Sequence, residues 1–95
     1  MSTIVAGDFE WDSEKAQLNH AKHGVAFEEA IYVLTSDDVV EMPDLEDSSR
    51  VITIGFSAVA RILYVVSTET GFRTRIISAR RATAEERRNF ADRKR

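Results

Sequence analysis

The sequence predicts one α+β domain, with two N-terminal helices packed on an antiparallel β-sheet of three to four strands and a short C-terminal helix. Two observations indicate this class. Helix-capping residues and helical periodicity come first in the chain, and β-rich runs with short connectors follow them. The 95 residues suffice for a single apolar core, so residues 1–95 are expected to form one domain, with 1–8 frayed.

The two N-terminal helices are defined by their ends and by one apolar stripe. Asp12 can cap a helix over about residues 13–22, and Gly24 suits the left-handed residue that ends such a helix. The second helix is expected over about residues 27–35. Its apolar residues recur at i, i+3, i+4 and i+7, the spacing of a core-facing stripe, and they are Phe27, Ala30, Ile31 and Leu34.

The sheet is expected from four runs that follow these helices. A short edge strand lies at VVEM, and the only proline falls directly after it, at the start of an acidic loop. Short connectors between the next three β-rich runs predict an antiparallel meander, with strands over about residues 50–56, 61–68 and 73–80. Thr83 and Glu86 then form a capping box that opens a helix over about residues 84–93.

Composition and the absence of known motifs exclude several classes of protein. The chain is 43% hydrophobic and 31% charged, as globular proteins are, and it has no cysteine for disulfides, thiolate nucleophiles or zinc sites. It contains no phosphate-binding loop, dinucleotide-binding glycine pattern, zinc-ligand spacing or serine-nucleophile elbow, so we expect neither a cofactor nor a metal. Without a signal segment or a membrane-length apolar run, the expected location is the cytoplasm.

Charge is distributed unevenly along the chain. Residues 1–70 contain four Lys/Arg and thirteen Asp/Glu, a net charge of −9, whereas residues 71–95 contain nine and three, a net charge of +6. A basic C-terminal quarter on an acidic protein is typical of a surface that meets phosphates or an acidic partner. A solvated, arginine-rich terminal helix would give the same composition.

The first helix has a polar face. Lys15, Asn19 and His23 are spaced at i, i+4 and i+8, and Lys22 lies beside that row. Such a face is tolerated either because the helix lies on the surface or because the face has a function. His23 by itself fits a structural position near the helix-end carbonyls, and His20 is expected to be exposed.

The last β-rich run is rich in arginine. Strict alternation places Arg73 and Arg75 on one side of the sheet and Arg80 on the other. An arginine inside a strand needs a carboxylate or phosphate partner to offset its desolvation, and Glu69 could supply the carboxylate across the preceding hairpin. Glu69 and Arg75 therefore form either a structural ion pair or part of a site.

Lysine, histidine, glutamate and arginine suffice for one reaction that needs no cofactor, the cleavage of RNA by its own 2′-hydroxyl. The protein must align the attack, remove one proton, protonate the leaving 5′-oxygen and neutralise the charge of the phosphorane. Arginine forks suit the last of these tasks.

Several segments resemble the BrnT family of toxins. FEWDSEKAQLNHAKHGVAFEEA is similar to the opening motif of that family, and RVITIG and STETGFRTRIISARRATAEER match it further along, so the resemblance covers about residues 9–90. It implies a RelE-like fold and a toxin of a type II toxin–antitoxin system that arrests growth as a metal-independent endoribonuclease. It also implies a cognate BrnA-like antitoxin of the ribbon-helix-helix type, and a complex that binds its own promoter DNA.

Carried over residue by residue, the resemblance implies an active region that contains Lys15, His23, Glu69, Arg75 and Arg80. Glu69 or His23 would be the general base, Lys15 or His23 the general acid, and Arg75 with Arg80 would stabilise the phosphorane. Flanking phosphates would be bound by four further basic residues, namely Lys22, Arg61, Arg73 and Arg81. These roles require that the first helix and the last strand converge on one phosphate-sized hollow.

Two alternatives stay open in the sequence. Trp11 or Phe9 could stack on an RNA base or pack beneath the sheet. The chain could also be a non-catalytic nucleic-acid-binding module or a co-repressor, for which positive charge alone would suffice. One departure from the family is Ala26, where a serine often caps the second helix; its absence should cost about 1 kcal/mol.

Overall fold

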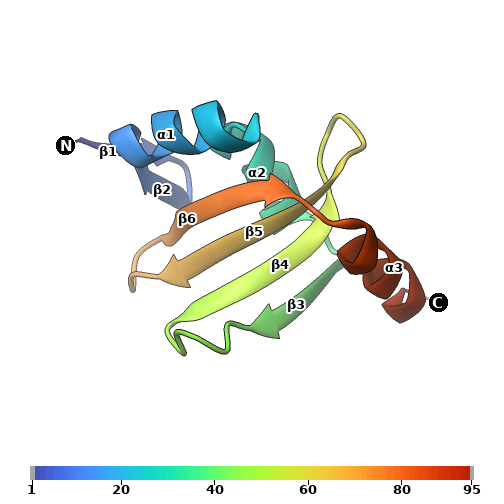
Figure 1. The fold of residues 1–95 in the computed structure, drawn as a ribbon. Coiled ribbons are helices and arrows are strands. Elements are labelled where there is room, and N and C mark those ends of the chain that lie inside the picture. The colour runs from blue at the N-terminus through green and yellow to red at the C-terminus, as the bar shows by residue number, and fades with distance from the viewer. Residues whose placement is uncertain (1, 95) are drawn as a thin grey trace.

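The computed structural model describes residues 2–94, which form three helices and one six-stranded sheet (Figure 1). In chain order the elements are β1 (Thr3–Ala6), β2 (Phe9–Asp12), α1 (Ser13–His23), α2 (Phe27–Thr35), β3 (Val39–Pro43), β4 (Arg50–Phe56), β5 (Ile62–Glu69), β6 (Thr74–Arg81) and α3 (Ala84–Arg93). The strand order is β1-β2-β6-β5-β4-β3, and β2 with β6 is the parallel pair. Within this range no helix is long and apolar enough to cross a membrane.

The predicted helices and the antiparallel meander are confirmed. The Asp12 carboxylate accepts a hydrogen bond from the backbone of the first turn of α1 at 2.9 Å, and Gly24 ends that helix with a φ of 70°. Thr83 and Glu86 form the predicted capping box of α3. Ala26 gives α2 no side-chain cap, as expected. Helix boundaries therefore follow from residues that satisfy the terminal backbone groups.

The sheet is larger than predicted because the N-terminal segment adds two strands. β1 and β2 form an antiparallel hairpin, so the stretch expected to be frayed contains a paired strand. β2 then pairs with β6 in parallel through Phe9 opposite Thr74 and Glu10 opposite Arg75. The expectation of three to four purely antiparallel strands is corrected to a six-stranded mixed sheet. A four-residue strand that joins a partner 65 residues away leaves no periodic pattern in the sequence.

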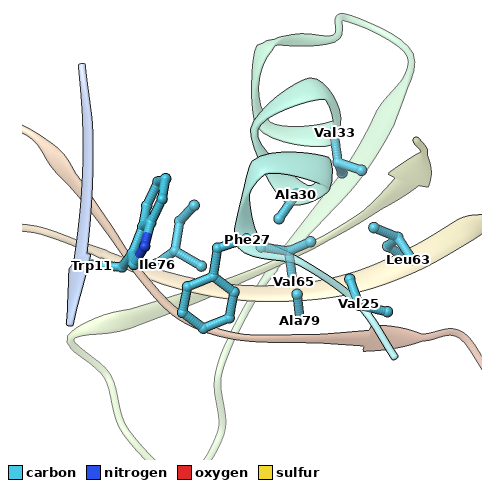
Figure 2. Packing of buried hydrophobic residues seen from close by; sticks show 9 residues of the cluster. All are labelled: Trp11, Val25, Phe27, Ala30, Val33, Leu63, Val65, Ile76 and Ala79. Carbon is cyan, nitrogen blue, oxygen red and sulfur yellow. The ribbon is translucent and has the colours of Figure 1, made fainter. Parts of the chain in front are cut away.

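Apolar side chains pack on both faces of this sheet. On the α2 face, the side that α1 and α2 cover, the core includes Trp11, Phe27, Leu63 and Val65 (Figure 2). Trp11 is 3% exposed and packs edge to face against Phe27, with the ring centroids 6.0 Å apart. Trp11 therefore belongs to the core. The opposite side, the α3 face, carries a smaller cluster to which α3 contributes Phe90.

A bulge in β6 changes the side from which its arginines project. Two successive residues of β5 pair with residues two apart on β6, so Ile77 has no partner on β5. As a result Ile76 and Ala79 both lie in the α2-face core although they are three positions apart. Arg75 and Arg80 consequently both project from the α3 face. The prediction from strict alternation, which separated them, is wrong for this strand.

Asn19 anchors the polar side of α1 to the edge of β6. β2 pairs only with the beginning of β6, which leaves the Ala79 backbone without a strand on that side. The Asn19 amide takes the place of that strand: Nδ2 donates to the Ala79 carbonyl at 2.8 Å, and Oδ1 accepts from the Ala79 N–H at 3.1 Å. Nδ2 also donates to the Val25 carbonyl at 3.0 Å. One buried side chain thereby joins α1, β6 and the segment that leads into α2.

We expect replacement of Asn19 to destabilise the protein. Asn19→Ala leaves three buried backbone groups without partners, so the free energy of unfolding measured by urea titration should fall by about 2–4 kcal/mol. Asn19→Asp keeps the shape and the acceptor but cannot donate, and it should cost a similar amount. Gln17→Ala, on an exposed part of α1, is the control and should stay within about 0.5 kcal/mol of the wild type. Losses under about 1 kcal/mol for both Asn19 variants would contradict the anchoring role.

Candidate functional site

Three arginines line one hollow at the end of the sheet where β6 leads into α3. The hollow has a volume of about 350 Å³ and lies between the end of β4, the start of β5 and the beginning of α3. We call it the arginine hollow; its lining includes Arg61, Arg81 and Arg87, with Phe56 and Ile62 beside them. Arg61 and Arg81 belong to the phosphate-binding residues expected from the sequence. The structure therefore brings two of those four residues together.

Arg61 is held in place by the acidic start of α2. Its Nε and Nη2 donate to the Glu29 carboxylate at 2.9 and 2.6 Å, and Nη2 also donates to the Gly24 carbonyl at 3.0 Å. The hydrogen bonds from Arg61 lower the pKa of Glu29, and the nearby charge of Arg81 acts in the same direction. Glu29 is therefore ionised at neutral pH and balances the charge of Arg61.

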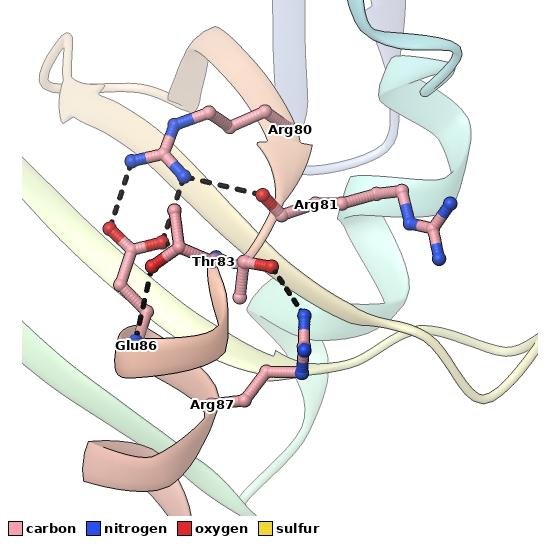
Figure 3. Close-up of polar contacts among 6 residues, drawn as sticks. Arg80, Arg81, Thr83, Glu86 and Arg87 are labelled. Carbon is pink, nitrogen blue, oxygen red and sulfur yellow. Dashed lines mark hydrogen bonds and ion pairs between the residues drawn. The ribbon is translucent and has the colours of Figure 1, made fainter.

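Arg81 and Arg87 line the hollow without forming an ion pair to any carboxylate of residues 2–94. Arg87 Nη1 donates to the Ala82 carbonyl at 2.9 Å, which fixes this side chain across the junction of β6 and α3 (Figure 3). The Arg81 side chain is exposed, and within residues 2–94 it forms no hydrogen bond or ion pair. In Figure 3 its guanidinium extends away from Glu86. The arginine hollow consequently keeps an excess of positive charge.

This arrangement suits an anion with several oxygens. Guanidinium groups stay charged at physiological pH, and their forked N–H donors match the oxygens of a phosphate. Arg61 and Arg87 are positioned by their internal hydrogen bonds, and Arg81 can offer all its donors without breaking one. The hollow can therefore bind a phosphodiester and stabilise negative charge that develops on it.

Arg80 is not among the residues that line this hollow, and its side chain extends instead toward Tyr64 and Glu86. Its two terminal nitrogens donate to the two Glu86 oxygens at 2.8 and 2.9 Å, and Nη1 donates to the Arg81 carbonyl at 3.2 Å. Its guanidinium also lies 3.9 Å above the centre of the Tyr64 ring, whose pKa is raised chiefly by burial. These contacts make Arg80 a brace for the junction from which Arg81 and Arg87 extend (Figure 3).

Arg75 pairs with a different carboxylate from the one predicted. Its Nη1 lies 2.5 Å from Oε2 of Glu10, on the parallel strand β2. Glu69 instead accepts a hydrogen bond from the Thr74 hydroxyl at 2.6 Å, and the strand register puts it on the α2 face, away from Arg75. The predicted Glu69 to Arg75 contact is therefore wrong. Arg73 donates to a carbonyl of the turn between β1 and β2 at 3.3 Å, at the opposite end of β6 from the hollow.

The basic residues of α1 do not gather with Arg75 and Arg80. α1 packs against the α2-face core and the edge of β6, whereas those two arginines project from the α3 face. Lys15 and Lys22 are exposed, and neither has a side-chain hydrogen bond or ion pair among residues 2–94. The expected convergence of the first helix and the last strand on one hollow is therefore wrong in this form.

Of the residues predicted to transfer protons, His23 is followed directly in the chain by a residue that binds an arginine of the hollow. It is half-buried in the last turn of α1, and the next residue is Gly24, whose carbonyl accepts a hydrogen bond from Arg61. Its position at the end of the helix also agrees with the structural alternative, in which an imidazole lies near the terminal carbonyls. His20 is exposed, as expected.

Sequence reasoning missed Arg87 and Phe56 as residues of this site. Arg87 comes directly after the capping-box residue Glu86. Once the start of α3 was fixed, the side of the helix on which Arg87 lies could have been inferred. Phe56 ends β4, and no local pattern distinguishes an exposed strand end from a buried one. Within the described part of the chain, no three His, Asp or Glu side chains gather as a metal site would require.

The contact between Arg80 and Glu86 predicts a pH-dependent contribution to stability. The hydrogen bonds from Arg80 lower the pKa of Glu86 below 4.5, so the contribution is complete above that pH and is lost as the pH falls through the lowered pKa. Glu86→Gln keeps the capping box but removes the charge, and at pH 7 it should reduce the free energy of unfolding by about 1 kcal/mol. Unfolding measured across acidic pH should show this difference vanish at low pH. A difference that does not shrink as the pH is lowered below 4.5 would mean that the pair is not its source.

Comparisons with known proteins show the family and the fold of this chain. The family model of the ribonuclease toxin BrnT, of type II toxin–antitoxin systems, matches residues 11–86. The 1.1 Å crystal structure of the Brucella abortus ribonuclease toxin BrnT is similar to this chain, with a TM-score of 0.64 and 29% identity; the match covers 77% of this chain and 92% of that one. No curated protein matched the chain. Because the family model spans most of the sequence, the chain belongs to the BrnT family of ribonuclease toxins of type II toxin–antitoxin systems.

Proposed function

We propose that the arginine hollow binds the scissile phosphodiester of RNA and that cleavage proceeds through the 2′-hydroxyl of the substrate without a metal ion. The observation that carries this proposal is the unbalanced charge of Arg81 and Arg87 beside the fixed guanidinium of Arg61. Membership of a ribonuclease toxin family supports the reaction class. The hollow offers a place where the reacting phosphate could lie.

In such a cleavage the 2′-oxygen attacks phosphorus and the 5′-oxygen of the next nucleotide leaves. The products are a 2′,3′-cyclic phosphate and a 5′-hydroxyl; one proton leaves the 2′-hydroxyl and one reaches the departing oxygen. The intermediate phosphorane carries an additional negative charge. Arg81 and Arg87 would offset that charge, while Arg61 would hold a non-bridging oxygen.

Proton transfer is assigned to His23, because its neighbour Gly24 contacts Arg61 through the backbone. Lys15 has a weaker claim, since it lies two turns earlier on α1. Glu69 also has a weaker claim, because it ends β5 whereas Arg61 precedes the start of that strand. Arg80 is assigned a positioning role through its bonds to Glu86 and to the Arg81 carbonyl.

The proposed partner is a BrnA-like antitoxin of the ribbon-helix-helix type, and the proposed location of both proteins is the cytoplasm. Acidic side chains that cover the arginine hollow would block RNA and would be attracted by its charge. The complex of toxin and antitoxin would bind its own promoter DNA. The match of this chain to a family of type II toxins supports the proposal that its partner is a protein antitoxin.

Loss of Arg81 should abolish most of the ribonuclease activity. We expect Arg81→Ala and Arg87→Ala to lower the single-turnover rate constant for cleavage of a short RNA by roughly 100-fold or more, because each removes a donor to the phosphorane. The measurement is single-turnover cleavage of end-labelled RNA in EDTA, with detection of the cyclic phosphate. Arg88→Ala is the matched control, since Arg88 is exposed on α3 and lines no part of the hollow.

The same assay tests the mechanism and the non-catalytic alternative. RNA with a 2′-O-methyl group at the cleavage position should bind but stay intact, and EDTA should leave the wild-type rate unchanged. Equal rates for Arg81→Ala and Arg88→Ala would overturn the assignment of the hollow. Binding of RNA without cleavage by the wild type would instead favour a nucleic-acid-binding module.

A further inference from the structure

The arginine hollow contains an exposed aromatic ring that ribonuclease chemistry does not require. Phe56, the last residue of β4, is 43% exposed and lines the hollow together with Arg61, Arg81 and Arg87. The preceding residues of β4 on this face, Ile52 and Ile54, are buried under α3-face side chains. Phe56 is thus the point at which the apolar α3 face opens into a positively charged hollow.

The phenyl ring is held from one side by the core. It meets the ring of Phe90 edge to face, with the centroids 5.7 Å apart and an interplanar angle of 77°, and Phe90 itself is 5% exposed. Phe56 also pairs with Ile62 in the sheet, directly beside Arg61. Phe56 and Arg61 therefore lie at neighbouring ends of the paired strands β4 and β5, while Arg81 ends β6 and Arg87 lies in the first half of α3.

Among residues 2–94, Phe56 is the aromatic residue that lines the arginine hollow. Trp11 is buried, and Tyr64 is covered by the guanidinium of Arg80. Phe72 is 92% exposed, but it lies in the turn between β5 and β6, at the end of those strands away from the hollow. Phe56 is the ring that a ligand bound to Arg81 would meet.

Single-stranded nucleic acid is recognised by this pairing of features. Its phosphates are bound by arginines, and its bases stack on aromatic rings, which accept any base because every base has a flat face. A ring fixed beside the phosphate site would also set the orientation of the adjoining sugar. Such orientation matters for an in-line attack.

We propose that Phe56 is the platform on which one base of single-stranded RNA stacks while the neighbouring phosphate binds Arg81 and Arg87. This inference rests on the proposed function of the arginine hollow and adds a base subsite to it. It assigns Phe56 to substrate positioning and leaves proton transfer to other groups. It also predicts a preference for unpaired RNA, because a base inside a duplex cannot reach the ring.

The experiment measures binding of an 8-nucleotide 2′-O-methyl RNA, which cannot be cleaved by 2′-hydroxyl attack. Phe56→Leu, which retains apolar packing on Phe90, should weaken binding by roughly 5- to 100-fold, and Phe56→Trp should restore it. Phe72→Leu is the matched control and should bind like the wild type. Thermal unfolding of each variant shows whether the fold is kept.

Abasic nucleotides identify the contact. An abasic nucleotide is placed at each position of the RNA in turn. At the position that stacks on Phe56, it should weaken binding to the wild type by the same factor as Phe56→Leu. It should not weaken binding to the Phe56→Leu variant any further. Phe56→Leu should leave the salt dependence of binding unchanged, whereas Arg81→Ala should lower the slope of log affinity against log salt by about 0.7.

The outcomes separate the base subsite from the hollow itself. Loss of binding with Arg81→Ala but not with Phe56→Leu would overturn stacking and keep the phosphate site. Wild-type binding by both variants would overturn the proposed function of the hollow. If Phe72→Leu weakened RNA binding as much as Phe56→Leu, the effect would not be specific to the ring in the hollow. That result would also overturn the inference.

Discussion

The pairing of the Asn19 amide with the backbone of Ala79 is the constraint on which the rest of the structure depends. β6 has β5 on one side, but on the other side it has β2 only at its beginning. The amide satisfies the N–H and the carbonyl that the missing strand would have paired. Along this edge of β6, β2 pairs with the beginning of the strand and α1 takes over further along. The amide therefore holds the end of β6, from which Arg80 and Arg81 extend.

This constraint also accounts for the polar character of α1. A helix that packed on the sheet through apolar residues alone would cover one face and leave the edge of β6 open. α1 instead contributes Ala16 to the α2-face core and directs a buried amide at the strand edge. The buried polar residue of this helix, Asn19, therefore serves hydrogen bonding to the backbone of β6.

Ion pairing divides five arginines, Arg61, Arg75, Arg80, Arg81 and Arg87, into two classes. Arg61, Arg75 and Arg80 each contact a carboxylate that is more buried than the arginine, which offsets their partial desolvation. Arg81 and Arg87 have no carboxylate partner among residues 2–94, and they line the solvent-accessible hollow. The same residue type thus braces the fold at three positions and leaves charge for a ligand at two. Sequence position does not reveal the class, because the partners come from distant elements.

Local features were predictable from the sequence, and long-range ones were not. The caps at Asp12, Gly24 and Thr83 fixed helix boundaries because their hydrogen bonds join residues within one turn. The short parallel contact of β2, the bulge at Ile77 and the pairing of Arg75 with Glu10 all depend on elements far apart in the chain.

The candidate site shows the same division. Arg61 and Arg81 were expected from the family resemblance to bind phosphates, and they share a hollow. The grouping of Lys15, Glu69, Arg75 and Arg80 was wrong because the two arginines project from one face of the sheet while Glu69 and α1 lie toward the other. Arg87 and Phe56 could be recognised only after the strand ends and α3 had been placed.

The position of β6 in the sheet has a consequence for synthesis of the protein. This strand lies between β5 and β2 and holds α1, yet it is the last strand to leave the ribosome. Until it emerges, the N-terminal hairpin and α1 have no sheet to join, and Arg61 has neither Arg81 nor Arg87 beside it. A nascent toxin therefore has no complete charged hollow until β6 and α3 have both been synthesised.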